Sequence, residues 1–328
     1  MDRIAGRITI IVLLAVAVGG CMNGSAEPLA TKKTSDVFAA DREAPAEPVA
    51  FDAKRAMGYL EALCKIGPRI SGTAGMKKQQ QLLEKHFKDR GGEIAWQRFS
   101  ATQRSVRKGV DMANLIASWH PDRQRRVILC SHYDTRPLAD QEHDTRRWRQ
   151  PFLSANDGGS GVALLMELSN HMKDLKCNVG VDFVFFDGEE YVFEQDDEYF
   201  FGSKHFGRDY RRSGDKKFYG AAILLDMVGG KNASFPVEPH SWEMAPGLVR
   251  VIWGIAGELK CSAFDEKSFG ARVQDDHLAL NQNGIPAIDI IDFKYPYWHR
   301  LTDLPENCSG DSLEQVAKVL SVWLQRVK

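Results

Sequence analysis

Three stretches of the chain share one pattern, in which a short apolar run ends abruptly on polar residues. The runs are 127–131, followed by His132 and Asp134; 181–186, followed by Asp-Gly-Glu-Glu; and 221–225, followed by Asp226. Continuous apolar runs of this length are typical of strands buried on both faces of a parallel sheet. The pattern therefore predicts central strands that carry polar residues at their carboxyl ends, and the run 285–291 predicts a last strand.

Between these strands, apolar residues recur at helical spacing. Asp52 can cap a first helix, and the closing helix has its core face between Leu313 and Val327. Further helices are expected at 71–92, 162–168, 202–212 and 245–260, and a short one after Gln274–His277 that ends at Asn283 and Gly284. Alternating strands and helices predict an α/β fold, with a single three-layer domain over 51–328 and a mixed, mainly parallel twisted sheet between the helix layers.

The remaining segments are less regular. Two strand-like runs at 93–100 and 114–119 flank a basic turn and predict the antiparallel edge of the sheet. The acidic and aromatic segment 191–201 is expected to form a lid, and residues 230–242 are expected to form a loop.

The N-terminus has the layout of an export signal. Arg3 and Arg7 precede the apolar run 8–18, which is too short to span a bilayer and is followed by Gly-Gly-Cys21. The Val-Gly-Gly-Cys sequence resembles a bacterial lipobox, in which the cysteine is lipidated. We therefore expect a signal peptide over 1–21 and a lipid anchor at Cys21 as the only membrane attachment; a periplasmic or secreted protein is the alternative. Residues 22–50 have the composition of a flexible tether.

Composition excludes some functions. The 328 residues are 27% charged with a formal net charge of -1, which gives no reason to expect nucleic-acid binding. None of the six cysteines has CxxC spacing, so a thiolate zinc site is not expected. Cys130 and Cys177 lie in apolar surroundings typical of core residues. The oligomeric state is not encoded in any visible motif, and a monomer is the simplest expectation.

Acidic residues and histidines gather at one predicted rim of the sheet. They are His132, Asp134, Asp157, Glu189, Glu190, Asp226 and His299. Each follows a strand or lies in a loop on the rim where the carboxyl ends of parallel strands meet, which is where such sheets bind ligands. Carboxylate oxygens and imidazole nitrogens with an open position are typical of catalytic zinc sites, and a neighbouring free carboxylate can transfer protons.

These motifs also carry a resemblance to a known family. Residues 51–328 resemble the zinc aminopeptidase superfamily in His132-Tyr133-Asp134, the Asp157 loop, the Asp-Gly-Glu-Glu strand end and the late His299. Within that superfamily, the chain is most similar to the glutaminyl cyclases (glutaminyl-peptide cyclotransferases). The more specific elements are Gln274-Asp275-Asp276-His277 and Trp298-His299.

The resemblance implies a metal centre and a reaction. One zinc ion would be held by Asp157, Glu190 and His299, and Glu189 would shuttle protons. The substrate would be a peptide or protein that begins with glutamine, whose α-amine attacks its own side-chain amide and expels ammonia to leave pyroglutamate. Because the attack is intramolecular, positioning supplies much of the rate enhancement.

The resemblance also implies how the substrate is held. Asp226 would bind the substrate's amino group, and Asp275 would hydrogen-bond into the same network. Gln274 and Trp298 would line the substrate pocket, with Trp298 steadying the amide oxygen.

The chain departs from the animal glutaminyl cyclases at several positions. Their loop after the glutamate pair carries a tryptophan, whereas 191–201 has other aromatic residues and no tryptophan. Asp289 stands where they have a histidine, and Cys130 and Val162 do not reproduce their cysteine pair. These differences bear on substrate preference and leave the metal chemistry unchanged.

Two other functions remain open from the sequence. In a two-zinc aminopeptidase, His132 and Asp226 would bind a second zinc ion, Asp157 would bridge both ions and Glu189 would activate water. A tethered binding module without catalysis is the third possibility, although such relatives usually lose metal ligands. Metal stoichiometry separates the first two, and absence of bound metal would favour the third.

Overall fold

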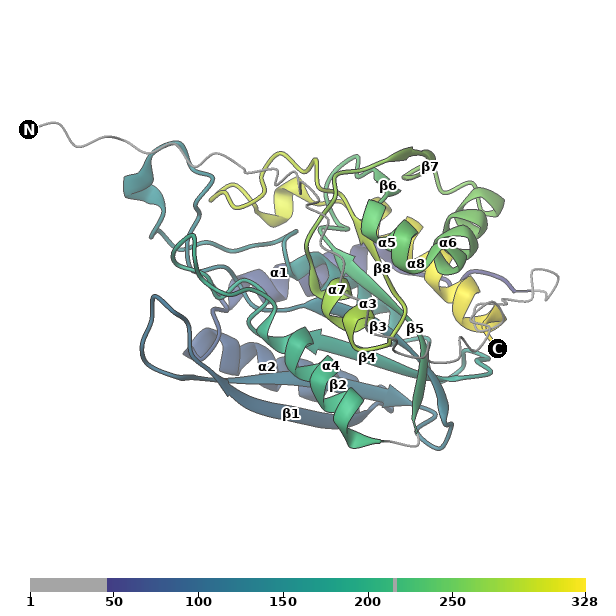
Figure 1. Cartoon of the computed structure of the whole chain (residues 1–328). Helices are drawn as coiled ribbons and strands as arrows, with labels where there is room; N and C mark the ends of the chain where they lie inside the picture. Colours follow the sequence, from purple (N-terminus) through teal and green to yellow (C-terminus); the bar gives the residue numbers. More distant parts are fainter. Residues whose placement is uncertain (1–45, 215–216) are drawn as a thin grey trace, which may run out of the picture. The chain divides into compact units, whose positions relative to one another are not determined.

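In the computed structural model of the protein, which describes residues 46–214 and 217–328, six strands form one sheet in the order β1-β2-β4-β3-β5-β8 (Figure 1). The strands are β1 (Glu93–Ala101), β2 (Val110–Trp119), β3 (Arg125–His132), β4 (Gly180–Phe186), β5 (Phe218–Asp226) and β8 (Ala287–Ile291). β4, β3, β5 and β8 run parallel, whereas β2 is antiparallel to both β1 and β4. The predicted mixed, mainly parallel sheet with an antiparallel edge is confirmed.

Helices cover both faces of this sheet (Figure 1). One face packs against α1 (Ala53–Lys65), α2 (Ala74–Lys88), α3 (Gly159–Leu168), α6 (Pro246–Glu258) and α8 (Gly310–Arg326), and the other against α4 (Phe201–Ser213) and α7 (Asp276–Gln282). Successive residues of β3 alternate between the two cores, with Leu129 in the first and Cys130 in the second. Both faces are buried because side chains alternate along a strand, which explains the continuous apolar runs.

Side chains close in sequence cap the N-termini of the first two helices. The Asp52 carboxylate accepts a hydrogen bond from the backbone N–H of Arg55, and the Thr73 hydroxyl caps α2 at Met76. Such caps satisfy backbone donors that the first helical turn leaves free. Within the described part of the chain, no helix is both long and apolar enough to cross a membrane.

The prediction of a loop over 230–242 is wrong. This segment contains β6 (Phe235–Val237) and α5 (Pro239–Met244), and β6 pairs in parallel with β7 (Phe264–Phe269). The strand forms because Phe235 is fully buried and pairs with Phe264, almost 30 residues further along the chain. Local periodicity does not reveal a pairing at this distance. Two 3-10 helices, η2 (Thr145–Arg147) and η3 (Pro305–Asn307), complete the described elements.

The strand register places the last residues of β3, β4, β5 and β8 side by side, so the predicted rim residues lie at the same edge of the sheet. His132 pairs with Phe186 of β4, Cys130 lies opposite Leu224 of β5, and Asp226 lies opposite Ile291 of β8. The chain therefore leaves four adjacent parallel strands at the same edge of the sheet, which brings their following loops together.

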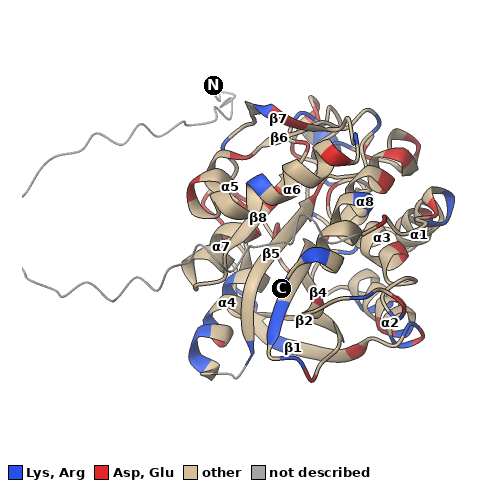
Figure 2. Ribbon diagram, turned by 90° about the vertical axis from the view of Figure 1, so that its right-hand side faces the viewer, with Lys and Arg blue, Asp and Glu red and all other residues tan. Residues whose placement is uncertain are grey.

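Charged residues are mixed on the exposed helix faces. Lys88 pairs with Glu84 on α2, and Lys318 pairs with Glu314 on α8. On the helices, ribbon segments with basic residues and segments with acidic residues follow one another (Figure 2). Exposed pairs of this kind contribute little stability, so the buried cores dominate the folding free energy.

The cysteines of the described chain are buried and unpaired. Cys130 is fully buried and Cys177 nearly so, which confirms their prediction as core residues. The predicted signal peptide, with Cys21, and the tether up to residue 45 lie outside the described residues. Ahead of α1, Ala46 and Val49 already pack against the larger core.

Candidate active site

The predicted rim residues meet at the carboxyl ends of β3, β4 and β5. His132 ends β3, Glu189 and Glu190 follow β4, and Asp226 ends β5. Asp157 comes from the loop before α3, and His299 from the loop after β8. These side chains form one buried cluster, although His132 and His299 are 167 positions apart in the sequence.

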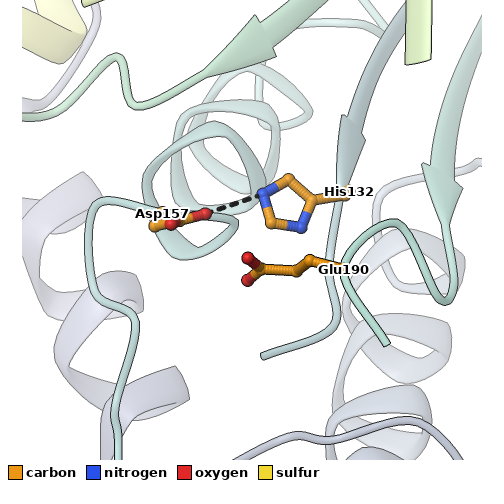
Figure 3. Close-up of side chains that lie close together, drawn as sticks. All are labelled: His132, Asp157 and Glu190. Atoms are coloured by element: carbon orange, nitrogen blue, oxygen red, sulfur yellow. Dashed lines mark ion pairs between the residues drawn. The ribbon is translucent and has the colours of Figure 1, made fainter. Parts of the chain in front are cut away.

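His132 lies between two carboxylates. Its Nε2 is 3.1 Å from Asp157 Oδ1 and 3.3 Å from Asp226 Oδ1. Figure 3 shows the side chains of His132, Asp157 and Glu190 pointing toward one another, and one ligand atom from each lies within 4.8 Å of the others. The structure therefore brings together more possible metal ligands than the three implied by the family resemblance.

His299 completes a second group around Asp157. Its Nε2 is 3.1 Å from Glu190 Oε2 and 3.5 Å from Asp157 Oδ2. Asp157 thus has one oxygen near His132 and the other near His299. A carboxylate with this orientation can bind one ion or bridge two.

The orientation of His299 depends on Asp140, a residue that sequence reasoning missed. Asp140 Oδ1 lies 2.9 Å from His299 Nδ1, so the other ring nitrogen faces Glu190 and Asp157. Metal-binding histidines commonly have such a carboxylate partner, which fixes the tautomer and ring orientation. The need for a partner was foreseeable, but nothing in the sequence distinguishes Asp140 from other aspartates.

The Asp157 loop is held by a second missed residue, Asp303. Its carboxylate accepts hydrogen bonds from the backbone N–H groups of Asn156, at 2.9 Å, and Asp157, at 3.1 Å. The next residue, Gly158, has a φ of 71°, and a Cβ there would lie 2.6 Å from the His132 ring. Glycine is required because a larger residue would push this ring away from Asp157.

Asp134 and Arg136 hold the glutamate pair. The fully buried Asp134 carboxylate accepts hydrogen bonds from the backbone N–H groups of Glu189 and Glu190, at 3.0 and 3.2 Å. The backbone N–H of Arg136 donates to Glu190 Oε1 at 2.9 Å. Glu190 is thereby fixed, whereas the Glu189 side chain keeps a small exposed fraction of 13%.

Several backbone conformations beside the site are unusual. Positive φ angles of 48°, 51° and 53° occur at Met227, Ser154 and His299, next to or within the cluster. Left-handed conformations are disfavoured for residues with a Cβ, and they are concentrated at functional sites where surrounding contacts compensate for their cost. The geometry thus indicates a site organised for ligand binding.

Burial dominates the electrostatic environment of Glu189. Burial raises the pKa of its carboxyl group well above the usual value, and the nearby Glu190 and Asp275 add to this effect while His132 opposes it. A raised pKa brings a carboxyl group closer to the working pH of a general acid and base. A bound cation would act in the opposite direction on the same group.

The side chains present fit a zinc ion. The described structure gives Asp157 Oδ2, Asp226 Oδ1 and His132 Nδ1 no hydrogen-bond partner, although all three atoms are buried. Buried polar atoms without partners are costly, and a cation among carboxylates removes that cost. Asp, Glu and His side chains supply the oxygen and nitrogen ligands that zinc prefers.

The remaining predicted residues lie around this cluster. Trp298 is half-buried and stacks on His299, with ring centroids 4.0 Å apart. Asp275 caps α7 and is buried, and burial together with Asp226 and Asp276 raises its pKa well above the usual value. Gln274, which precedes it, is exposed and borders a groove beside the site.

Three of the positions that differ from the animal cyclases, Asp289, Cys130 and Val162, are buried. Asp289 is fully buried, with His277 Nδ1 4.0 Å from its carboxylate, and Cys130 and Val162 are fully buried in the cores. His277 also faces Glu238 at 3.4 Å. In the segment 191–201, Tyr199 stacks against the Arg136 guanidinium and is half-buried.

Comparisons with known proteins agree with this geometry. The sequence profile of Peptidase family M28 matches residues 114–324. A glutaminyl-peptide cyclotransferase of Bos taurus is 23% identical over 242 residues, which cover 65% of this chain and 65% of that protein. The chain therefore matches slightly less than two thirds of the length of this relative.

Solved structures match over nearly their whole length. A Fimbriiglobus ruber glutaminyl cyclase is 49% identical with a TM-score of 0.83, over 87% of this chain and 99% of that one. A leucine aminopeptidase precursor from Bacteroides thetaiotaomicron is 29% identical with a TM-score of 0.81, over 87% and 100%. The fold is thus shared by proteins named as cyclases and as aminopeptidases.

Proposed function

The chain belongs to peptidase family M28, and from this premise we propose that it is a zinc-dependent glutaminyl cyclase. It would convert the N-terminal glutamine of peptides or proteins to pyroglutamate and release ammonia. The observation that carries the proposal is the position of the Glu189 carboxylate, 3.7 Å from His132 in the cluster that also contains Asp157, Glu190 and His299, in a chain 49% identical to a glutaminyl cyclase of known structure.

We propose that Asp157, Glu190 and His299 hold one zinc ion. Support comes from the short distances of His299 Nε2 to both carboxylates and from the Asp140 carboxylate behind its ring. When bound, zinc supplies a Lewis acid that polarises the amide carbonyl of the substrate and stabilises negative charge on its oxygen.

Glu189 is the proposed general base and acid. The substrate's α-amine forms a bond to the carbon of its own side-chain amide, and the bond from that carbon to the amide nitrogen breaks. Glu189 takes the proton from the attacking nitrogen and delivers it to the departing nitrogen, which leaves as ammonia. The raised pKa of Glu189 favours a carboxyl group that can both accept and return this proton.

Four further residues would position the substrate. Asp226 accepts hydrogen bonds from the α-amine, and Asp275 supports it from the start of α7. Trp298, which stacks on His299, and Gln274, which lines the neighbouring groove, would line the substrate pocket. Holding the amine against the amide carbon raises the rate of cyclisation, because the reacting groups are already oriented, which they are not in solution.

One observation favours a second function. His132 Nε2 lies 3.1 Å from Asp157 and 3.3 Å from Asp226, and these three side chains would hold a second zinc ion. With two ions, Glu189 would activate water and the protein would be an aminopeptidase. The higher identity to a glutaminyl cyclase, 49% against 29%, makes this the less favoured function.

The experiment that tests the function uses the purified protein with its zinc content measured. One peptide headed by glutamine and one headed by leucine are incubated with it and followed by mass spectrometry. Loss of ammonia from the first, with the second unchanged and close to one zinc ion per chain, supports the cyclase. Release of free leucine with two zinc ions per chain would make the protein an aminopeptidase instead.

We also propose, from the N-terminal sequence, that the protein is exported and anchored by a lipid on Cys21, with the catalytic domain beginning near Phe51. Labelling with a radioactive fatty acid in a bacterial host tests the anchor. Wild-type protein should incorporate label and the Cys21→Ala variant should not; equal labelling contradicts the proposal. A monomer remains our expectation, which light scattering would check.

A further inference from the structure

A cavity outside the catalytic cluster lies between helix α2 and the paired strands β1 and β2. Its volume is about 440 Å³, which is within the range of roughly 300–1,000 Å³ that small-ligand sites occupy. Its lining includes Met76, Lys77 and Gln80 of α2, and Arg98, Asp111 and Ala113 of the strands. None of these residues takes part in the reaction proposed above, so the cavity is a separate feature of the molecule.

Three charged side chains of the lining have no ion-pair partner among residues 46–214 and 217–328. They are Lys77, Arg98 and Asp111, and all three are exposed. Lys85 and Lys88, further along the same helix, both form ion pairs. The cavity therefore presents two cations and one anion that are free to bind a ligand.

The strand register places the two opposite charges of the strands on one face of the sheet. Arg98 lies opposite Ala113, and Asp111 lies opposite Ser100, so Arg98 and Asp111 are diagonal neighbours. Diagonal neighbours in an antiparallel pair are typically about 7–8 Å apart. The Arg98 guanidinium also lies over the Trp96 ring, 5.5 Å from its centroid, which orients it. A small group that carries both charges would fit between the two side chains.

The lining also has apolar residues next to these charges. Met76 is 1% exposed and Ala113 is 2% exposed. A methionine side chain adapts its shape to a neighbour, and its sulfur makes favourable contacts with aromatic rings. A ligand with an apolar body would therefore be favoured over a purely polar one, because its apolar surface leaves water when it binds.

One hydrogen-bonded link joins the cavity to the end of β3. The Gln80 side chain donates to the Tyr133 hydroxyl at 3.0 Å, and this hydroxyl donates to the backbone oxygen of Ala113. Tyr133 is fully buried and stands between His132 and Asp134 in the sequence. A change at the cavity wall therefore reaches the residues at the end of β3 through a single side chain.

A second link joins the cavity to the glutamate turn. The backbone N–H of Ala113 donates to one oxygen of Asp187 at 2.8 Å, and the Ser71 hydroxyl donates to the other at 2.6 Å. Asp187 is fully buried and is followed by Gly188, Glu189 and Glu190. Networks of packed and hydrogen-bonded groups of this kind can carry coupling between two sites.

We propose that this cavity binds the zwitterion of an α-amino acid with a large apolar side chain, and that the bound amino acid increases the activity of the catalytic cluster. The carboxylate would pair with Arg98 and Lys77, the ammonium group with Asp111, and the side chain would contact Met76. This ligand gives each free charge of the lining an opposite partner, which a simple anion or cation does not. The effect on activity rests on the proposed function, whereas the binding does not.

The test of binding is isothermal titration calorimetry of the purified protein with L-phenylalanine. The wild type should bind one equivalent. Arg98→Gln and Asp111→Asn should each weaken binding at least about tenfold, because each removes a charged partner of the ligand. 3-Phenylpropionate lacks the ammonium group and phenylalaninamide lacks the carboxylate, so each should bind the wild type about tenfold more weakly than L-phenylalanine.

Arg125→Gln is the matched control, because Arg125 is an exposed arginine at the start of β3, outside the cavity lining. It should bind L-phenylalanine as the wild type does. Equal binding to the wild type, Arg98→Gln and Asp111→Asn would place the ligand elsewhere, for example at the metal centre, and overturn the proposal. Absence of binding to the wild type would overturn it as well.

The test of coupling measures ammonia release from Gln-Ala-Ala. Saturating L-phenylalanine should raise kcat/KM of the wild type about fivefold and leave that of Arg98→Gln unchanged. Gln80→Met should still bind L-phenylalanine but lose most of this increase, because its side chain no longer donates to Tyr133. A wild-type rate that stays unchanged or falls would refute the effect on activity. If the wild type releases no ammonia at all, the cyclase function fails, while calorimetry still decides whether the binding site exists.

Discussion

At the scale of single residues, the site depends on carboxylates that never touch the reacting atoms. Asp134 holds the glutamate turn, Asp303 holds the Asp157 loop, and Asp140 orients His299. Each accepts its hydrogen bonds through its carboxyl oxygens, each of which has lone pairs for more than one donor. The reactive side chains are therefore placed by a second layer of acidic residues.

Glu189→Gln should abolish cyclisation while leaving the fold and the bound zinc unchanged. The amide keeps the size of the side chain but cannot accept and return a proton, so kcat should fall by at least about 100-fold. The measurement is ammonia release together with metal content. Glu194→Gln, an exposed glutamate in the following segment, is the control and should behave as wild type; substantial activity in Glu189→Gln would contradict the assigned role.

Asp140→Ala should weaken zinc binding. Loss of the carboxylate frees the His299 ring to rotate, and removal of such partners typically lowers metal affinity by about 10–100-fold. Competition with a zinc-binding dye measures the affinity directly, without relying on activity. Asp144→Ala, at an exposed aspartate of the same segment, should retain wild-type affinity; if both variants bind zinc equally, Asp140 has no orienting function.

At the scale of elements, the short helix α5 shows how a segment without a strong local signal becomes ordered. Glu238 precedes it and accepts hydrogen bonds from the backbone N–H groups of His240, at 2.9 Å, and Ser241, at 2.6 Å. The same carboxylate accepts from the Val273 N–H at 3.2 Å, which ties the helix to the segment before α7. One buried acid thus joins two elements that are distant in the sequence.

Glu238 should make the stability of the protein depend on pH in acid. Burial opposes its ionisation, but His277 and the backbone donors outweigh burial and lower its pKa to about 2. An unfolded glutamate has a pKa of about 4.3, so the stabilisation is complete above that pH and is lost as the pH falls toward about 2. Urea unfolding from pH 2 to 7 should show this loss in the wild type.

The variant Glu238→Gln should be less stable at neutral pH and should show a shallower decline in acid. Glu243→Gln is the control, because Glu243 is exposed on the same helix. A decline of equal steepness in wild type and Glu238→Gln would show that other carboxylates account for the acid sensitivity.

At the scale of the whole described domain, the two ends of the sheet have different polar clusters. Opposite the active site, Arg126 donates to Asp182 at 2.9 Å and to the Trp119 backbone oxygen at 3.1 Å, and the Tyr219 hydroxyl donates to Asp182 at 2.7 Å. These side chains join β2, β3, β4 and β5 at the end away from the loops that form the candidate active site. Stability and chemistry are thus concentrated at opposite ends of the same strands.

Arg126→Met should destabilise the protein strongly without directly changing the active site. Both Arg126 and Asp182 are almost completely buried, and removing one partner leaves an uncompensated buried charge, which costs about 3–5 kcal/mol. Chemical denaturation measures the free energy of unfolding. Arg125→Met, at the exposed neighbouring arginine, should change it little; equal stability of the two variants would show that the buried pair contributes nothing.

The sequence alone determined the central strands, most of the helices and the set of polar residues that meet at one rim of the sheet. Continuous apolar runs identify strands buried on both faces, and strand ends that carry Asp-Gly-Glu-Glu or Asp226 point to one rim. These features are local, because periodicity and strand ends involve neighbouring residues only. The chain order of the motifs then carried the family resemblance.

Only the tertiary structure decided which residues face one another. The contact of Asp140 with His299 joins positions 159 apart, and the pairing of β6 with β7 depends on burial of Phe235 between distant segments. The hydrogen bond from the Gln103 side chain to the backbone oxygen of Tyr191, 88 positions away, is of the same kind. Hydrogen bonds of this range follow from how whole elements pack, so local patterns of polar and apolar residues do not encode them.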